Sequence, residues 1–302
     1  MTRRPQIGFL PDGRRLHLQD GPIDLIIEAW GGGADILAAY DAAARRFTGL
    51  LDELCEELRE LRKPADPERS KLDGTVARRM HAAVAPLASE HFITPMAAVA
   101  GAVAEEILGA MVQTAQLSRA YVNNGGDIAL HLAEGEHFTL GLLDRPDQIG
   151  LMNTTVIGAE DPARGIATSG RHGRSFSLGI ADAATVLART AAQADAAATI
   201  IANAVDLPGH PAIVRCPAQD LQPDSDLGAR LITRDVGFLQ TAEIAAALEA
   251  GARKAHTLLT HGLIESAVLR LHSETRIVAP NAIDARVPPA LCHSVARKSV
   301  MQ

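Results

Sequence analysis

The chain has 302 residues, a formal net charge of −7, 47% hydrophobic residues and only 3% aromatic residues. At about 150 residues per domain, this length suggests one large domain or two ordinary ones, and the hydrophobic fraction excludes an intrinsically disordered chain. The acidic balance argues against a nucleic-acid-binding surface, but it leaves room for an anionic ligand in a local basic pocket.

The first half of the chain predicts a hairpin, then helices, then strands. A hairpin is expected over residues 14–30 around an Asp-Gly turn. Apolar residues that recur at steps of three and four predict one long helix over residues 37–61. The remaining elements expected here are helices at 75–89 and 96–116 and strands at 120–123, 128–132, 137–143 and 151–157.

The second half alternates strands with Ala-rich helices. We expect a loop or short strand at 165–170, a strand within 175–187, a helix at 190–205, strands at 212–216 and 230–233, a helix at 241–263 and a last strand within 267–278. Many strand pairs have hairpin-length connections. This pattern favours an α+β fold, with helices packed on mixed or antiparallel sheets, over a doubly wound fold.

Cysteine usage and hydropathy bear on the location of the chain. The residues 1–10 lack the apolar core of a signal peptide, and the most apolar window, 95–104, is too short to cross a membrane. The cysteines form neither a disulfide framework nor a zinc-ligand pattern. They are Cys55, Cys216 and Cys292. We therefore expect a cytoplasmic protein.

Three glycines at 31–33 follow a strand and open a helix, which superficially suggests a dinucleotide-binding loop. The fingerprint needs glycine where this chain has Ile36, and the preceding strand belongs to a hairpin. A flexible strand-to-helix turn is the better interpretation.

A second glycine motif, Asn-Asn-Gly-Gly-Asp at 123–127, lies between two predicted strands. Its glycines would let backbone N–H groups approach a ligand closely, and its Asn and Asp side chains supply polar groups for hydrogen bonds. The alternative is a plain hairpin turn, since Asn-Gly is a strong hairpin signal.

The segment 165–174 contains three glycines, two hydroxyl side chains, two arginines and a histidine. Successive N–H groups in a Gly-rich turn can form an anion-binding nest, and arginines add charge-assisted hydrogen bonds to phosphate. A solvated loop is the alternative.

Asp195 and Thr199 are four residues apart in a predicted helix, so they share one helical face. A carboxylate and a hydroxyl together suit a hard cation such as Mg²⁺. The alternative is a solvated Asp195 in the first turn and a Thr199 packed in the core.

The three motifs occur in the order 124–127 (Asn-Gly-Gly-Asp), 165–170 (Gly-Ile-Ala-Thr-Ser-Gly) and 194–199 (Ala-Asp-Ala-Ala-Ala-Thr). This order resembles the ApbE-like superfamily, whose known enzymes are FAD:protein FMN transferases with a GGD segment, an ATSG segment and an AD-x-x-x-T helix. The resemblance covers roughly residues 15–206, within the part of the chain that we delimit as 1–206, and is closest to a soluble branch of the superfamily.

The resemblance implies an ApbE-like (T-fold-like) architecture for a single domain over 1–302, with 207–302 as a C-terminal extension packed on it. It implies a cleft for FAD or a related nucleotide, with Mg²⁺ held by Asp195 and Thr199. The cofactor-binding residues implied by the motifs are Asn124, Gly125, Gly126, Asp127, Thr168, Ser169 and Gly170.

The chain also departs from the transferases. Their histidine segment before the metal helix and their lysine before the GGD motif have no counterpart here. Arg171, His172 and Arg174 are candidate substitutes, and Asp182 stands where the histidine segment would be. We therefore expect catalytic roles for Asp182 and His172 and cofactor binding by Arg171 and Arg174.

Two classes of function follow from these motifs. The first is a Mg²⁺-dependent, flavin- or nucleotide-binding transferase with an altered substrate. The second is a non-catalytic cofactor-binding or accessory protein, for cofactor delivery or sulfur assimilation. In both cases the expected partner is a small anionic ligand, with no nucleic acid and no membrane, and a homodimer is left open.

Overall fold

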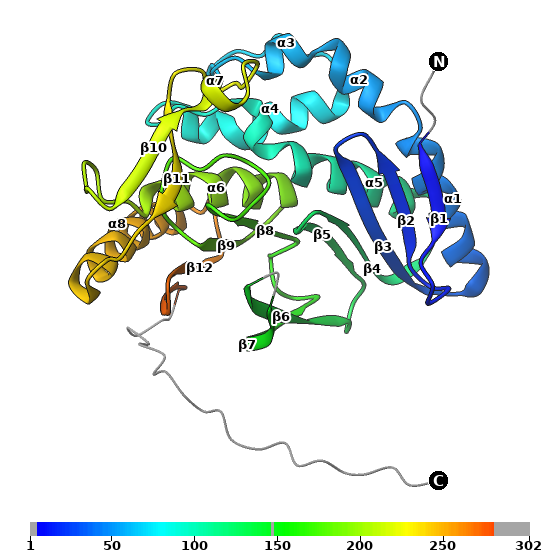
Figure 1. Ribbon diagram of the computed structural model, residues 1–302. Coiled ribbons are helices and arrows are strands. Elements are labelled where there is room, and N and C mark those ends of the chain that lie inside the picture. Colours follow the sequence, from blue (N-terminus) through cyan, green and yellow to red (C-terminus); the bar gives the residue numbers. More distant parts are fainter. Residues whose placement is uncertain (1–4, 146–147, 281–302) are drawn as a thin grey trace, which may run out of the picture.

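A nine-stranded antiparallel sheet forms the base of the molecule, in a computed structural model that describes residues 5–145 and 148–280 (Figure 1). The strand order is β1-β2-β3-β4-β5-β8-β9-β12-β13. These strands are β1 (Gln6–Phe9), β2 (Leu16–Asp20), β3 (Ile23–Gly31), β4 (Leu117–Asn124), β5 (Asp127–Leu132), β8 (Gly165–Ser169), β9 (Ala183–Ala188), β12 (Ser266–Leu271) and β13 (Glu274–Val278).

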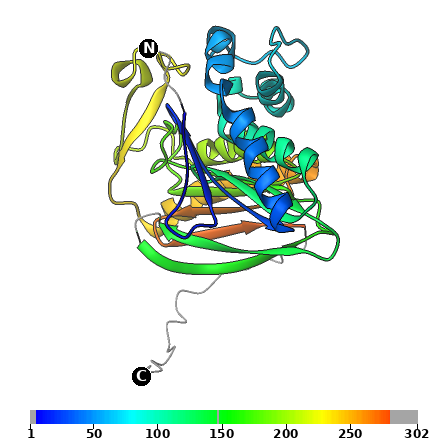
Figure 2. The same cartoon turned by 90° about the vertical axis from the view of Figure 1, so that its right-hand side faces the viewer.

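Helices cover one face of this sheet, and a long hairpin lies on the other side (Figure 2). The helices packed on the strands are α1 (Gly33–Phe47), α5 (Val99–Thr114), α6 (Ala191–Ala204) and α8 (Thr241–Thr260). The helix α4 (Thr75–Ala88) lies against α5 and α6. Shorter helical segments are α2 (Leu50–Glu56), α3 (Leu58–Leu61), α7 (Ala218–Leu221) and the 3₁₀ helix η1 (Pro95–Ala98).

The chain order contains the same arrangement twice. Each half consists of two strands, then two helices that pack on the sheet, then two further strands. In the first half these are β2 and β3, α1 and α5, and β4 and β5; in the second half they are β8 and β9, α6 and α8, and β12 and β13. The two halves meet where β5 pairs with β8 over only two positions, Ile128 with Ile166 and Ala129 with Gly165. Because all the pairings are antiparallel, the β2–β3, β4–β5, β8–β9 and β12–β13 connections lie at one end of the sheet.

Small side chains bring the helices close to each other and to the sheet. The buried face of α6 consists mainly of alanine, and that of α5 includes Gly101, Ala102 and Ala104. A Cβ atom at residue 101 would collide with the backbone of Ala191, so the two helices touch through their backbones there. The scarcity of aromatic residues thus corresponds to a core built for close helix packing.

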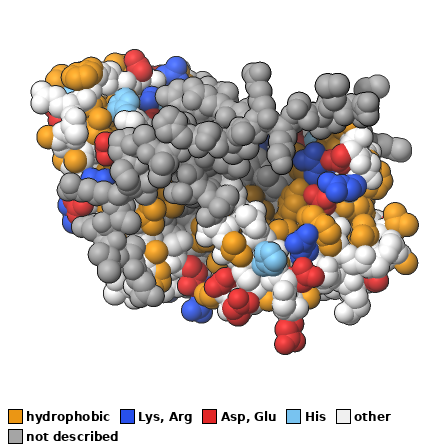
Figure 3. All heavy atoms as spheres, turned by 90° about the horizontal axis from the view of Figure 1, so that it is seen from below, with side chains coloured by type: hydrophobic (Ala, Val, Ile, Leu, Met, Phe, Trp, Pro, Cys, Tyr) orange, Lys and Arg blue, Asp and Glu red, His pale blue; other side chains and the backbone are white. Residues whose placement is uncertain are grey.

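Two further hairpins complete the fold. One is β6 (His137–Arg145) with β7 (Gln148–Gly158), and the other is β10 (Ile213–Pro217) with β11 (Leu231–Val236). A small second core, formed by Leu130, Leu132, Ile157, Ala163 and Ile166, joins β6–β7 to the face of the sheet that the helices leave open. Seen from that side, hydrophobic side chains reach the surface among charged ones (Figure 3).

The α+β class predicted from the sequence is confirmed, but four elements differ. The expected helix over 37–61 is wrong: Gly49, with φ of 86°, separates α1 from α2, and α3 follows. The expected last strand within 267–278 is a hairpin, and within 175–187 only residues from Ala183 onward form a strand. The edge strand β1 was not predicted, because its four residues are all exposed and lack alternation.

The segment Pro95–Thr114 is long and apolar enough to cross a membrane by length and composition. Half of its most apolar window is buried inside the fold, between the sheet and neighbouring helices. A helix that is apolar on all sides is also typical of a protein core, so its hydropathy is accounted for by packing.

Candidate functional site

The three sequence motifs come together where the two halves of the sheet meet. Asp127 begins β5, and Thr168 lies near the end of the neighbouring strand β8. The backbone N–H of Thr168 donates to Asp127 Oδ1 at 3.3 Å. From the helix side, Asp195 of α6 accepts a hydrogen bond at Oδ2 from the N–H of Gly101, at 3.1 Å.

The Asn-Gly-Gly-Asp motif is a tight turn between β4 and β5. Gly125 and Gly126 have φ of 65° and 114°, values that favour glycine, and the N–H of Gly126 donates to Asn123 Oδ1 at 2.8 Å. The buried Asn124 donates from Nδ2 to the Ala100 carbonyl at 3.1 Å. This bond ties the turn to the first turn of α5, next to the N–H that contacts Asp195.

The carboxyl groups of Asp127 and Asp195 influence each other. Burial raises the pKa of Asp127 to about 7, although the Thr168 N–H and the charge of Arg174 act in the opposite direction. Burial, and then the charge of Asp127, raise the pKa of Asp195 well above its usual range, against the N–H groups of Gly101 and Ala100. Neither carboxylate has an ion-pair partner within residues 5–145 and 148–280.

The oxygen atoms gathered here fit a hard divalent cation. Thr199 follows Asp195 by one helical turn and is partly buried, as Asp195 is, so the interpretation of Asp195 as a solvated side chain is wrong. The described residues contain no group of three or more His, Cys, Asp or Glu side chains that could hold a metal ion. Two carboxylates and a hydroxyl suit Mg²⁺, which keeps several waters and bridges to phosphates.

The glycines of the segment 165–170 have packing roles. A Cβ atom at Gly165 would collide with the backbone at Thr190, and one at Gly170 with the Asp182 carbonyl. The N–H groups of Thr168, Arg171 and Gly173 all donate to acceptors within the chain. The Thr168 hydroxyl shares a hydrogen bond with that of Thr185 at 2.9 Å, so Thr168 meets Asp127 only through its backbone.

Asp182 is the centre of a cluster of polar contacts beside this segment. Its Oδ1 accepts from Arg171 Nε at 2.8 Å and from His172 Nε2 at 3.1 Å, and its Oδ2 accepts from the N–H of His272 at 2.5 Å. The Asp182 side chain is 11% exposed, and that of His172 is 45% exposed. Because the carboxylate only accepts, Nε2 of His172 is the donor in this contact.

Arg174 lies over the glycine turn. Its guanidinium occupies the space where a Cβ atom of Gly125 would project, and it donates to the Pro22 carbonyl at 3.5 Å. Its charge also lowers the pKa of Asp127. Of the predicted cations, Arg171 is neutralised by Asp182, whereas Arg174 is exposed and has no ion-pair partner in the described part of the chain.

The aromatic side chains lie away from the carboxylates. Tyr121 is three residues before Asn124 on β4, so the two point to opposite faces of the sheet. Tyr121 packs with Trp30 and Phe138, and Arg119 lies 4.5 Å from the Trp30 ring centre. A surface hollow of about 490 Å³ lies at the base of the β6–β7 hairpin and contains neither Asp127 nor Asp195.

The sequence predicted a helix over 96–116, but the role of the backbone in the first turn of that helix was missed. Ala100 and Gly101 supply the carbonyl and the N–H that hold Asn124 and Asp195. A glycine inside an Ala-rich helix was the available signal, because such a residue often marks a close backbone approach. Cys292, one of the predicted free thiols, lies outside the described residues.

Comparisons with known proteins agree with the motifs. A family model described as AbpE bacteria matches residues 7–277, well beyond residue 206. A UPF0280 protein from Methanothrix thermoacetophila is 41% identical over 117 residues, which are 37% of this chain and 46% of that protein. One from Archaeoglobus fulgidus is 38% identical over 116 residues, 37% of this chain and 45% of that protein. The chain therefore spans just under half the length of these relatives.

Proposed function

Because this chain belongs to the family described as AbpE bacteria, an ApbE-like family, we infer that it binds Mg²⁺ together with a flavin or other nucleotide-type anionic ligand. The observation that carries this inference is the pair Asp127 and Asp195. Two partly buried carboxylates raise each other's electrostatic cost, and such a pair is retained when a bound cation offsets it.

Each residue of the site has a definite role in this proposal. Asp127 and Asp195 hold the cation, and the Thr199 hydroxyl lies one turn further along the same helix. The exposed guanidinium of Arg174 supplies positive charge beside the glycine turn, where the ligand's phosphates would lie. When bound, Mg²⁺ would neutralise charge on those phosphates.

Turnover by a transferase with an altered substrate is supported by the Asp182–His172 contact. Asp182 fixes the ring of His172, and Arg171 and the His272 N–H fix Asp182. The exposed Nδ1 of His172 can accept a proton from an attacking hydroxyl group, as an oriented imidazole does in general base catalysis. His172 would thus take the part of the histidine that the chain lacks.

The second candidate is a protein that holds or delivers a cofactor without turnover, or an accessory protein in sulfur assimilation. It is favoured by the absence of the transferases' histidine segment and lysine from the sequence. It is also favoured by the N–H groups of Thr168, Arg171 and Gly173, which donate to acceptors within the chain and are therefore not free for a ligand.

Ligand stabilisation tests the proposal and separates the two candidates. With Mg²⁺ and either FAD, FMN or ADP at a hundredfold excess over Kd, the free energy of unfolding should rise by about 2.7 kcal/mol. No shift with any of the three would contradict the proposed ligand class. Release of AMP from FAD would favour the transferase, and binding without AMP release would favour the cofactor-binding protein.

A further inference from the structure

The helices α5 and α6 cap each other at their first turns. Asp195 of α6 accepts from the N–H of Gly101 in α5, and Glu105 of α5 accepts at Oε1 from the N–H of Ala192 in α6, at 2.7 Å. The N-cap residue of α5, Ala98, provides no side-chain cap. In α6, Thr190 caps the Gln193 N–H and Glu105 adds an acceptor for the Ala192 N–H, whereas α5 receives its side-chain acceptor from Asp195.

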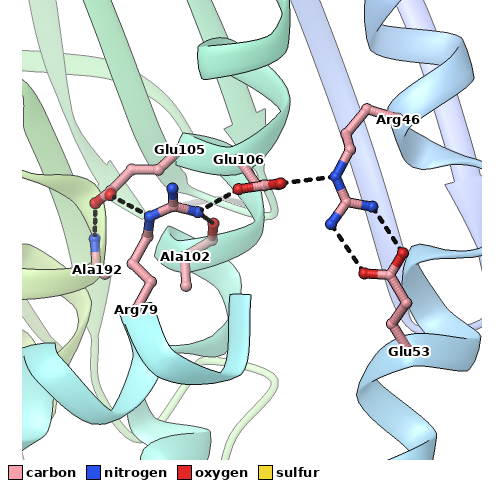
Figure 4. A network of polar contacts seen from close by, with 7 residues as sticks. All are labelled: Arg46, Glu53, Arg79, Ala102, Glu105, Glu106 and Ala192. Carbon is pink, nitrogen blue, oxygen red and sulfur yellow. Dashed lines mark hydrogen bonds and ion pairs between the residues drawn. The ribbon is translucent and has the colours of Figure 1, made fainter. Parts of the chain in front are cut away.

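A single arginine fixes the Glu105 side of this arrangement (Figure 4). Arg79 of α4 contacts Glu105 Oε2 through Nε at 3.1 Å and donates to the Ala102 carbonyl at 3.3 Å. It also contacts Glu106 at 2.8 Å, and Glu106 in turn contacts Arg46 at 2.6 Å. The carboxylate that caps α6 is thus held by a charge from a third helix.

We propose that Glu105 and Arg79 are positioning residues for the Asp127–Asp195 pair. Asp195 lies three residues after Ala192 in α6, so the position of the first turn of α6 determines whether the Asp195 carboxylate reaches the Gly101 N–H. Glu105 contacts neither carboxylate and acts through the backbone of α6. This inference rests on the proposed function, because it assigns these residues to the cation site.

Glu106 provides a matched control. It is adjacent to Glu105 on α5, has a similar exposure and shares Arg79 as an ion-pair partner. Its second ion-pair partner is Arg46 of α1, so its ion pairs within the described residues join it to α4 and α1. Removal of either carboxylate weakens the same polar network, but only removal of Glu105 leaves the Ala192 N–H of α6 without its acceptor.

Amide hydrogen exchange on the metal-free protein tests the inference first. In Glu105→Ala, the Gly101 N–H should exchange at least about tenfold faster, because a displaced α6 takes the Asp195 carboxylate away from it. In Glu106→Ala, the Gly101 exchange rate should stay as in the wild type. Equal Gly101 rates in Glu105→Ala and the wild type would overturn the inference. Glu105→Gln, which keeps an acceptor for Ala192, serves if the alanine variant does not fold, and should give a smaller increase of the same sign.

Mg²⁺ titration is the second readout. Residues that orient metal ligands from outside typically change affinity by about 10- to 100-fold. Glu105→Ala should weaken Mg²⁺ binding to this extent, and Glu106→Ala should leave it unchanged. If the wild type itself fails to bind Mg²⁺, the proposed function fails, while the exchange rates still decide the positioning role. If the wild type binds and Glu105→Ala binds equally well, only the positioning role fails.

Discussion

Glu105 and Asp195 perform the same structural task in opposite electrostatic surroundings. Each carboxylate accepts an N–H from the first turn of the neighbouring helix. Glu105 is paired with Arg79, whereas Asp195 has Asp127 as its charged neighbour. Helix capping alone explains the first carboxylate, because its charge is matched. The charge of the second is offset only by a proton or by a bound cation, and this difference is the reason to place the site at Asp195.

The close contact between the backbones of α5 and α6, on which both caps depend, can be disrupted by a substitution at Gly101. In Gly101→Ala the new Cβ atom would collide with the Ala191 backbone, so both caps should be lost and the free energy of unfolding should fall by roughly 3 kcal/mol. Gly109→Ala, in the same helix with open space around it, should raise stability by up to about 1 kcal/mol. Urea denaturation of both variants checks this contrast, and equal stabilities would contradict it.

Removal of the charge at Asp195 should distinguish its role as a hydrogen-bond acceptor for the Gly101 N–H from its role as a cation ligand. Asp195→Asn keeps a side-chain oxygen for the Gly101 N–H but removes the repulsion with Asp127. At pH 8 its metal-free stability should match or exceed that of the wild type, while the Mg²⁺-dependent gain of about 2.7 kcal/mol at a hundredfold excess over Kd should disappear. Thermal unfolding with and without Mg²⁺ measures both effects. A retained Mg²⁺ gain would show that Asp195 is not a ligand.

The pH dependence of the metal-free protein tests the pair from another direction. The folded pKa of Asp127, about 7, lies above its unfolded value of 3.8, so between these values the folded state holds a proton that the unfolded state has lost. The pair's contribution to stability is therefore present at low pH and is lost as the pH rises from about 4 to 7. The slope has an upper limit of about 1.4 kcal/mol per pH unit for one group.

Denaturant titrations at pH 5, 6, 7 and 8 measure this slope against Asp127→Asn. The slope should be smaller in the variant, in which only Asp195 keeps a pKa raised by burial. Because Mg²⁺ must displace the proton, its affinity should increase as the pH approaches 7. An identical slope in the variant would contradict the assignment of the proton to Asp127.

The smallest effect is expected at Thr168. Thr168→Val removes an exposed hydroxyl that bonds Thr185 but keeps the N–H that contacts Asp127, so the loss of stability should be about 0.5 kcal/mol. Mg²⁺ affinity, measured by calorimetry, should stay unchanged. A clear drop in affinity would mean that the hydroxyl, rather than the backbone, serves the site.

Local patterns predicted much of the fold. The β4–β5 turn followed from its glycines, and α6 from its Ala-rich segment capped by Thr190. The break at Gly49 was missed because the apolar seam continues through it, while the backbone turns into the left-handed region. The hairpin at 271–274 was missed because its turn contains His272 at φ of 52°, where glycine or asparagine is the usual signal.

The site was predictable only in part. Asp127 and Asp195 were singled out by motifs, but their proximity depends on a helix crossing made by the backbones at Gly101 and Ala191. The Asp182 contacts with Arg171 and His272 join residues up to 90 positions apart, which no local pattern encodes. Of the two arginines in the basic segment 165–174, Arg171 is therefore neutralised by Asp182, and Arg174 is exposed.

Titration of Mg²⁺ into the metal-free protein at pH 8, followed by calorimetry, tests the central claim most directly. The account predicts saturable binding at one site in the wild type, its loss in Asp127→Asn and in Asp195→Asn, and its retention in Glu106→Ala. Absence of binding in the wild type, or equal binding in the two aspartate variants, would contradict the assignment of these carboxylates to a cation site.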